Sequence, residues 1–226
     1  MSENEMDKVK SNRTPLLLLI LVLVIVAAAA AYFFLIRPGQ TPADTESLLL
    51  NIDELVLRPK DLPGTYNTET STHYTNAQIV NVMGAALGKT YAIQTGRVDG
   101  WQVYYVRSSA NQLAPEFIFN RTEVFENTQG ASLALSDEFF QAYTDEDKAP
   151  DQWLDRSCSY GQECILYSYR EVKAGAGVAT VRIDMAFRYK NVLIWMYVKG
   201  QEGEATEQQL FDFADILINR IDDLNK

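Results

Sequence analysis

Side chains that commonly catalyse reactions or bind metals are scarce in this chain of 226 residues. It holds one histidine, His73, and two cysteines, Cys158 and Cys164. A zinc site normally takes three or four cysteine, histidine or carboxylate ligands, and a Ser-His-Asp or Cys-His catalytic centre needs a histidine. The sequence therefore predicts no catalytic residue, no metal site and no cofactor. Enzymatic activity stays open, and its absence is favoured.

Motifs for phosphates and nucleic acids are also missing. No serine sits in a GxSxG elbow, and no glycine-rich phosphate loop is present, since KAGAG at residues 173–177 reads as a hairpin turn. The net charge is -10 and no basic run occurs. Because binding to nucleic acid depends on neutralising phosphates, we expect no nucleic-acid partner.

Charge is absent from residues 15–36, where 22 consecutive residues are apolar or small. At about 1.5 Å per residue, such a helix crosses the roughly 30 Å hydrocarbon layer of a bilayer. Three basic residues precede the run, and only Arg37 closely follows it. The positive-inside rule then places residues 1–14 in the cytoplasm and the bulk of the chain outside. The sequence predicts a single-pass protein of the cell membrane, held in it by residues 15–36.

The alternative for this segment is a cleaved secretory signal. Its small residues at 27–31 satisfy an A-x-A cleavage rule. However, residues 32–36 extend the apolar run to full spanning length, which favours a retained anchor. Cleavage in a fraction of the molecules stays open.

The part outside the membrane is expected to be one α+β domain. Residues 37–45, with two prolines and one glycine, form a short linker, and the domain covers residues 46–226. Residue spacing predicts an edge strand at 66–74, strands at 101–107, 116–125, 165–170, 181–190 and 192–198, and helices at 76–87, 131–143 and 204–224. This order favours two layers: an antiparallel meander sheet with the helices packed on one face.

The C-terminal half has the clearest periodicity. Apolar residues alternate with polar ones along 181–190, as in a strand with one buried face, while residues 192–198 are nearly all apolar and predict a central strand. One stripe of the terminal helix is apolar at spacings of three and four and is expected to face the sheet. Its members are Leu210, Phe213, Ala214, Leu217 and Ile221.

Cys158 and Cys164 are predicted to form a disulfide. Two nearby cysteines outside the cytoplasm usually pair, and Gly161 lets the short loop between them turn back. A redox centre is the alternative, but the spacing is not that of a CxxC motif.

Three other features invite functional interpretations. The acidic residues between 145 and 155 suggest calcium, but Pro150 and Arg156 violate the EF-hand template, so a solvated loop is expected. His73 lies on the expected edge strand, where a surface role is typical. Aromatic residues are abundant, and core packing explains most of them. A ligand-binding groove on the sheet is the alternative for the tyrosines at positions 104, 105, 167 and 169.

Two short stretches carry a family resemblance. DLPG at residues 61–64 and FRYKNVLIWMYVKG at residues 187–200, followed by a long terminal helix, resemble bacterial membrane-anchored extracytoplasmic α+β domains. These include sensor-like domains of anchored kinases and lipoprotein-like domains. The resemblance implies a bacterial cell-envelope protein and carries over no functional residue.

Three functions follow from these observations. The leading one is a membrane-anchored extracytoplasmic binding or interaction module for a protein or envelope ligand, because no catalytic constellation is visible. The second is an assembly or stability factor of a membrane complex, in which small residues at 27–31 permit close helix packing. The third is a carboxylate-dependent envelope hydrolase, which would need two carboxylates in one cleft, one of them with a raised pKa.

Overall fold

The computed structural model describes residues 51–109, 113–136, 139, 154–156, 158–172 and 177–224. The predicted anchor and linker lie outside these residues. Among the described residues, no helix combines the length and apolar character that crossing a membrane requires. All of them fall within one compact unit that begins at Asp44.

Strands dominate this unit. They are β1 (Tyr66–His73), β2 (Arg97–Arg107), β3 (Phe117–Phe125), β4 (Leu154–Arg156), β5 (Glu163–Val172), β6 (Ala179–Tyr189) and β7 (Val192–Gln201). The helices are α2 (Asn76–Met83), α3 (Ala85–Thr95), α4 (Thr128–Ala134) and α6 (Glu207–Asp223), preceded by the single turns η1 (Ile52–Glu54) and η2 (Pro59–Asp61). The predicted α+β class is confirmed.

The strands form a seven-stranded antiparallel sheet in the order β1-β2-β3-β7-β6-β5-β4. Two meanders, β1 to β3 and β4 to β7, therefore meet where β3 pairs with β7. The predicted edge position of β1 and the predicted central position of β7 are both confirmed. The expectation of one continuous meander is wrong, because β3 pairs with the last strand and not with the next one along the chain.

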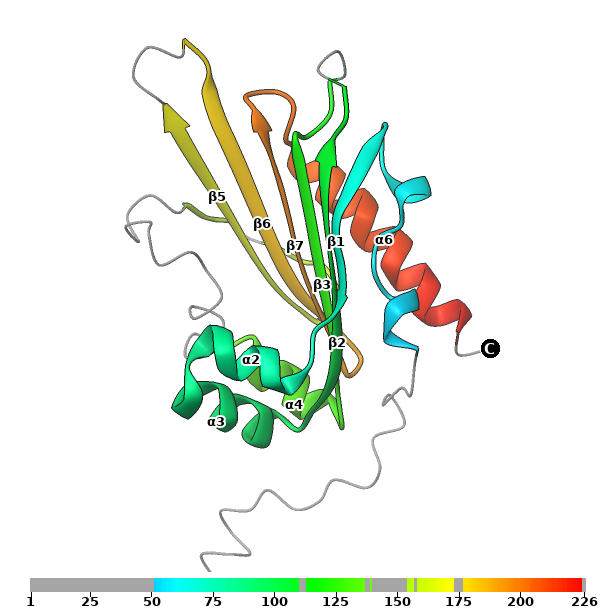
Figure 1. Ribbon diagram of the computed structural model, residues 1–226, viewed down its shortest axis with the longest axis vertical. Coiled ribbons are helices and arrows are strands. Elements are labelled where there is room, and N and C mark those ends of the chain that lie inside the picture. Colours follow the sequence, from blue (N-terminus) through cyan, green and yellow to red (C-terminus); the bar gives the residue numbers. More distant parts are fainter. Residues whose placement is uncertain are drawn as a thin grey trace, which may run out of the picture. The chain divides into compact units, whose positions relative to one another are not determined.

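Helices cover both faces of this sheet, so the predicted arrangement with all helices on one face is wrong (Figure 1). The reason lies in β7, which carries apolar side chains on both of its faces. Val192, Ile194 and Met196 pack toward α6, whereas Leu193 and Trp195 pack toward α3 and α4. A strand that is apolar on both sides needs a covering layer on each side.

The layer on the first face is α6 together with the segment after η1. Thr206 caps α6 by accepting a hydrogen bond from the Gln209 amide, and the predicted apolar stripe of α6 is buried. Leu55, Val56 and Leu57 are also buried here. Arg220 of α6 donates to the Val56 carbonyl at 2.6 Å and so ties this segment to the helix.

The layer on the second face consists of the helical hairpin of α2 and α3 together with α4. The predicted helix at 76–87 is broken at Gly84, whose φ of 82° is unfavourable for other residues, and α3 then continues to Thr95. Gly88 lets the two helices approach closely, because a Cβ there would lie 2.6 Å from the Val80 Cα. The predicted helix at 131–143 overlaps α4 only at residues 131–134, because α4 begins at Thr128 and ends at Ala134; residues 137–138 and 140–143 lie outside the described residues.

A buried ion pair fixes the hairpin to the sheet. Arg97 of β2 contacts Glu123 of β3 at 2.5 Å, and both side chains are almost fully buried. Tyr91 of α3 donates to the same carboxylate at 2.9 Å, and Arg97 also donates to Asn76 at 2.7 Å. The position of both helices therefore depends on charges that water does not reach.

Candidate functional site

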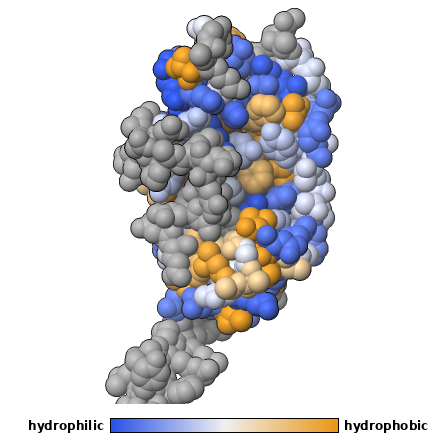
Figure 2. Space-filling model, turned by 60° about the vertical axis from the view of Figure 1, so that its left-hand side comes forward, coloured by the Kyte–Doolittle hydropathy of each residue, from blue (hydrophilic) through white to orange (hydrophobic). Residues whose placement is uncertain are grey.

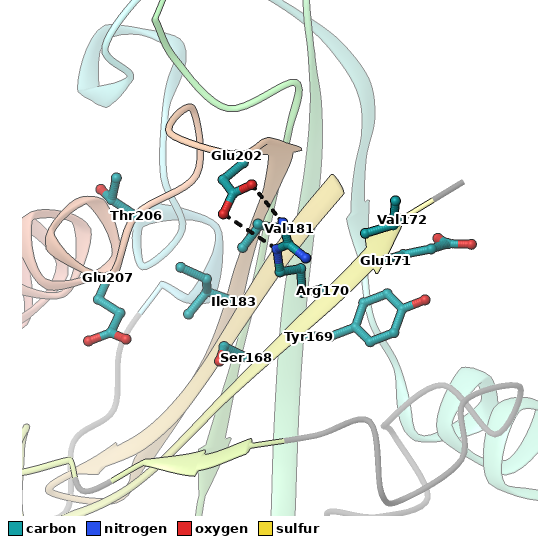
Figure 3. Close-up of a pocket in the computed structure, with 10 residues that line it drawn as sticks. All are labelled: Ser168, Tyr169, Arg170, Glu171, Val172, Val181, Ile183, Glu202, Thr206 and Glu207. Carbon is teal, nitrogen blue, oxygen red and sulfur yellow. Dashed lines mark hydrogen bonds and ion pairs between the residues drawn. The ribbon is translucent and has the colours of Figure 1, made fainter. Parts of the chain in front are cut away.

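A pocket of about 700 Å³ opens between the sheet and the N-terminal end of α6. It belongs to the size range of small-molecule sites. It is lined by Ser168, Tyr169, Arg170, Glu171, Val172, Val181, Ile183, Glu202, Thr206 and Glu207. In Figure 3 the side chains of Arg170, Val181 and Ile183 point to the α6 side of the strands, whereas Tyr169 and Glu171 point the other way.

An ion pair spans the rim of the pocket. Arg170 Nη2 of β5 lies 2.9 Å from Glu202 Oε2, and Arg170 Nε lies 3.4 Å from Glu202 Oε1. Both side chains are more than half exposed, at 56% and 57%. Such an exposed pair contributes little to stability. Breaking it so that either group can contact a charged ligand therefore costs little free energy.

The turn between β7 and α6 holds Glu202 in this position. Gly203 has a φ of 93°, which lets the chain reverse before Thr206 starts the helix. Glu204 fixes the turn: it accepts a hydrogen bond from the Gln201 amide at 2.9 Å and contacts Arg107 at 3.1 Å. Thus two contacts of Glu204 hold the base of the turn, while Glu202 itself faces solvent.

Apolar, hydroxyl and charged side chains all line the pocket. Val181 and Ile183 give it an apolar floor, and Ser168 and Thr206 add hydroxyl groups. The hydrogen bond and positive charge of Arg170 lower the pKa of Glu202 below its ordinary value. A general acid at neutral pH needs a raised pKa, so Glu202 is poorly suited to acid catalysis.

The two cysteines are joined in a disulfide. The bridge lies at the start of β5, whereas the pocket lies at its end. Tyr160, inside the loop, stacks on Phe211 with ring centroids 5.1 Å apart and donates to Asp215 of α6 at 2.6 Å. Gly161 is required here, because a Cβ would lie 2.3 Å from the Arg188 carbonyl oxygen. The bridge therefore organises the loop that docks on α6.

His73 lies outside the pocket, near the β1–α2 junction. Its Nε2 lies 2.5 Å from Asp99 Oδ1, and its ring stacks on Trp101 at 5.6 Å. Ser71 lies nearby, but its hydroxyl accepts a hydrogen bond from Trp101 Nε1 at 3.2 Å, and the structure records none between Ser71 and His73. The expected surface position of His73 agrees with its 49% exposed side chain.

Aromatic and charged side chains interleave on the face that α2 to α4 partly cover. Of the predicted tyrosines, Tyr104 lies on this face, and Tyr105 packs into the opposite core. The remaining members of this cation–aromatic cluster are Phe117, Phe119, Arg121, Arg182, Asp184, Trp195 and Tyr197. Burial raises the pKa of Tyr197 well above its ordinary value.

Within the cation–aromatic cluster, the charge of Arg182 is paired. Arg182 donates to both oxygens of Asp184, at 2.8 and 2.7 Å, and its guanidinium lies 4.0 Å from the centre of the Tyr197 ring. Phe119 stacks on Tyr197 with ring centroids 5.0 Å apart. The cluster therefore works as packing in which cations sit on ring faces. Sequence reasoning located some of the rings but none of the charges among them.

The acidic stretch proposed for calcium lies almost wholly outside the described residues. Within the described part of the chain, no group of three or more histidine, cysteine or carboxylate side chains is placed to hold a metal ion.

The pocket residues were missed by sequence reasoning. The available signal was weak. Ser168, Arg170 and Val172 fall on one face of β5, but Glu202, the partner of Arg170, comes from the turn after β7.

Comparison with known proteins bears on the fold. No family model matches the sequence, and no curated protein is significantly similar to it. The structure is similar to the crystal structure of the extracellular domain of PknH from Mycobacterium tuberculosis, with a TM-score of 0.52 and 10% sequence identity. The match covers 82% of this chain and 100% of that one. The chain therefore shares its fold with an extracellular domain, in line with the resemblance to extracytoplasmic α+β domains.

Proposed function

We propose that this chain is a membrane-anchored extracytoplasmic binding module and that its ligand occupies the pocket beside α6. The observation that carries the proposal is the combination of an apolar floor with the exposed Arg170–Glu202 pair at the rim. A ligand with an apolar body and a charged group fits this arrangement. The fold shared with an extracellular domain supports the placement outside the membrane.

The hydrolase alternative is less well supported. It requires a carboxylate with a raised pKa in a cleft, whereas the pKa of Glu202 is lowered. Glu171 lines the pocket but points away from Glu202 (Figure 3). Glu202 and Glu171 therefore do not face each other across the floor, and this pair is poorly arranged for glycoside hydrolysis.

Site-directed photocrosslinking in the native envelope tests the pocket. A photoreactive residue replaces Val181 on the pocket floor, and a second variant carries it at Asn219, an exposed position of α6 away from the pocket. We expect adducts from Val181 only, and their loss when Arg170→Ala and Glu202→Ala are added. Identical adducts from both positions, or none from Val181, would refute the pocket.

Protease treatment tests the proposed topology. With residues 15–36 as a retained anchor and the N-terminus in the cytoplasm, protease added to spheroplasts should remove the domain. A domain that resists digestion until the cells are lysed would place it on the cytoplasmic side.

A further inference from the structure

We infer that the hairpin of α2 and α3 docks on the surface of the bilayer that holds the anchor. This inference rests on the proposed anchor but not on the pocket. It commits to one occupant, a phospholipid surface, and three observations carry it: the composition of the hairpin, its exposed side chains, and its place at the end of the domain where the chain enters.

The hairpin is unusual in charge. Residues 76–96 hold no acidic residue and one basic residue, Lys89, although the chain has 30 acidic residues and a net charge of -10. An anionic bilayer repels a negatively charged surface. The hairpin is thus a surface of an acidic protein that can approach anionic lipids without this repulsion.

The exposed side chains of the hairpin are uncharged except for Lys89, and several of them are small or apolar. Ile93 and Val82 are 80% and 57% exposed, and Ala85 and Ala86 are exposed beside the Gly84 corner. Figure 2 shows hydrophobic surface gathered at the lower end of that view, where Figure 1 places α2 and α3. Lys89 can lay its aliphatic stem on this surface and direct its ammonium group to a phosphate.

The chain enters the domain at the same end. Thr122 donates to the carbonyl of Leu55, just after η1, at 2.7 Å. Thr122 pairs with Trp101, and Trp101 pairs with His73, two residues before the cap of α2. The first described turn and the hairpin therefore lie at one end of the sheet (Figure 1).

The intervening chain is short. Residues 37–50 separate the uncharged run from the first described residue, and when fully extended they reach roughly 50 Å. A tether of this length holds the domain near the lipid at an effective concentration on the order of millimolar, so even weak contacts are populated. Two exposed apolar side chains and one lysine are enough for such a contact when the anchor already holds the domain near the lipid.

Tryptophan quenching in vesicles tests this docking with the full-length chain. The parent, with its three native tryptophans, provides the baseline. Ile93→Trp adds a fourth tryptophan on the hairpin, and Asn219→Trp adds one at an exposed position of α6. Each protein is reconstituted in phosphatidylethanolamine–phosphatidylglycerol vesicles whose acyl chains carry bromine close to the headgroups.

We expect the bromolipids to quench most of the emission added by Ile93→Trp and little of that added by Asn219→Trp. A further Val82→Asp substitution should restore the Ile93→Trp emission, because a buried carboxylate opposes insertion.

A chain that floats with the vesicles but shows no quenching at position 93 refutes the docking alone. A chain that does not float refutes the anchor and the docking together. A third outcome is a blue shift of the emission at position 93 that grows with protein density but is not quenched by bromine. It would mean that the hairpin contacts a second copy of the chain, and it would refute the lipid surface.

Discussion

The two faces of the central sheet are packed in different ways. Toward α6 the contacts are mainly apolar and follow regular spacing, with Leu210, Phe213 and Leu217 in one core with Ile183 and Met196. Toward α2 to α4 the contacts mix aromatic rings with buried charges. Substitution of the core residues on the first face is therefore limited mainly by volume, whereas the second face also demands specific charged partners. One sheet thus combines non-directional and directional packing.

The strongest test of this contrast is the Arg97–Glu123 pair. Arg97→Ala leaves Glu123 buried without its cation and should cost roughly 3–5 kcal/mol of unfolding free energy. Urea denaturation of a soluble fragment beginning at Glu46 measures the effect.

Replacing both charges with Arg97→Met and Glu123→Leu should cost less than Arg97→Ala alone, because no uncompensated charge remains. If the double replacement is as damaging as the single one, the pair does not act as a unit.

The matching change on the other face is Leu217→Ala. Leu217 is fully buried in α6, so truncation removes transfer free energy and leaves a cavity, at a cost of roughly 2–5 kcal/mol. Leu217→Met keeps the volume and should cost less than about 1.5 kcal/mol. The neighbouring exposed Asn219→Ala is the control, with an expected change within about 0.5 kcal/mol. Equal and small losses for all three in urea melts would mean that α6 does not pack on the sheet.

The disulfide is expected to have a smaller effect on the α6 face. Cys158 and Cys164 are six positions apart, and closing so short a loop stabilises a domain by about 2 kcal/mol in the chain-entropy model. Replacing both cysteines with serine should lower the denaturation midpoint by a corresponding amount. The parent treated with reductant should match the variant, and mass spectrometry of a non-reduced digest should contain the linked peptides. Two free thiols in protein from the envelope would contradict the bridge.

The pH dependence of stability probes the same face. Burial raises the pKa of Tyr66 to about 12, and its hydroxyl donates to the Pro115 carbonyl. The unfolded chain releases this proton near pH 10, so the stabilisation is complete below about pH 10 and is lost as the pH rises to about 12. Unfolding free energies measured across this range should fall, and Tyr66→Phe should make the fall shallower. An unchanged slope in that variant would assign the effect to other tyrosines.

Periodicity predicted most of the elements, because alternation along β6 and the stripe on α6 are local properties. The second helical layer was missed, although β7 carried its signal: apolar residues at both parities require cover on both sides. The break at Gly84 was also visible in the sequence, but the apolar spacing continued across it. Local pattern therefore identified the elements better than their layers.

The candidate site could not be predicted in the same way. Arg170 and Glu202 meet only because β5, β6 and β7 pair in register and the turn after β7 folds back. Likewise, nothing local marks Glu123 as the partner of Arg97. Ion pairs between distant strands depend on the assembled sheet, and a single sequence gives no measure of that proximity.

The junction of β3 with β7 has a consequence for biosynthesis. Phe119 finds its partner Tyr197 only when the chain has been made as far as β7. A nascent chain that emerges from its N-terminus must hold β3 as an open edge until β7 arrives, and α6, which covers one face, follows β7. Open strand edges recruit other chains. The interval before β7 emerges is therefore the stage at which β3 can pair wrongly, and truncation before β7 leaves this edge open permanently.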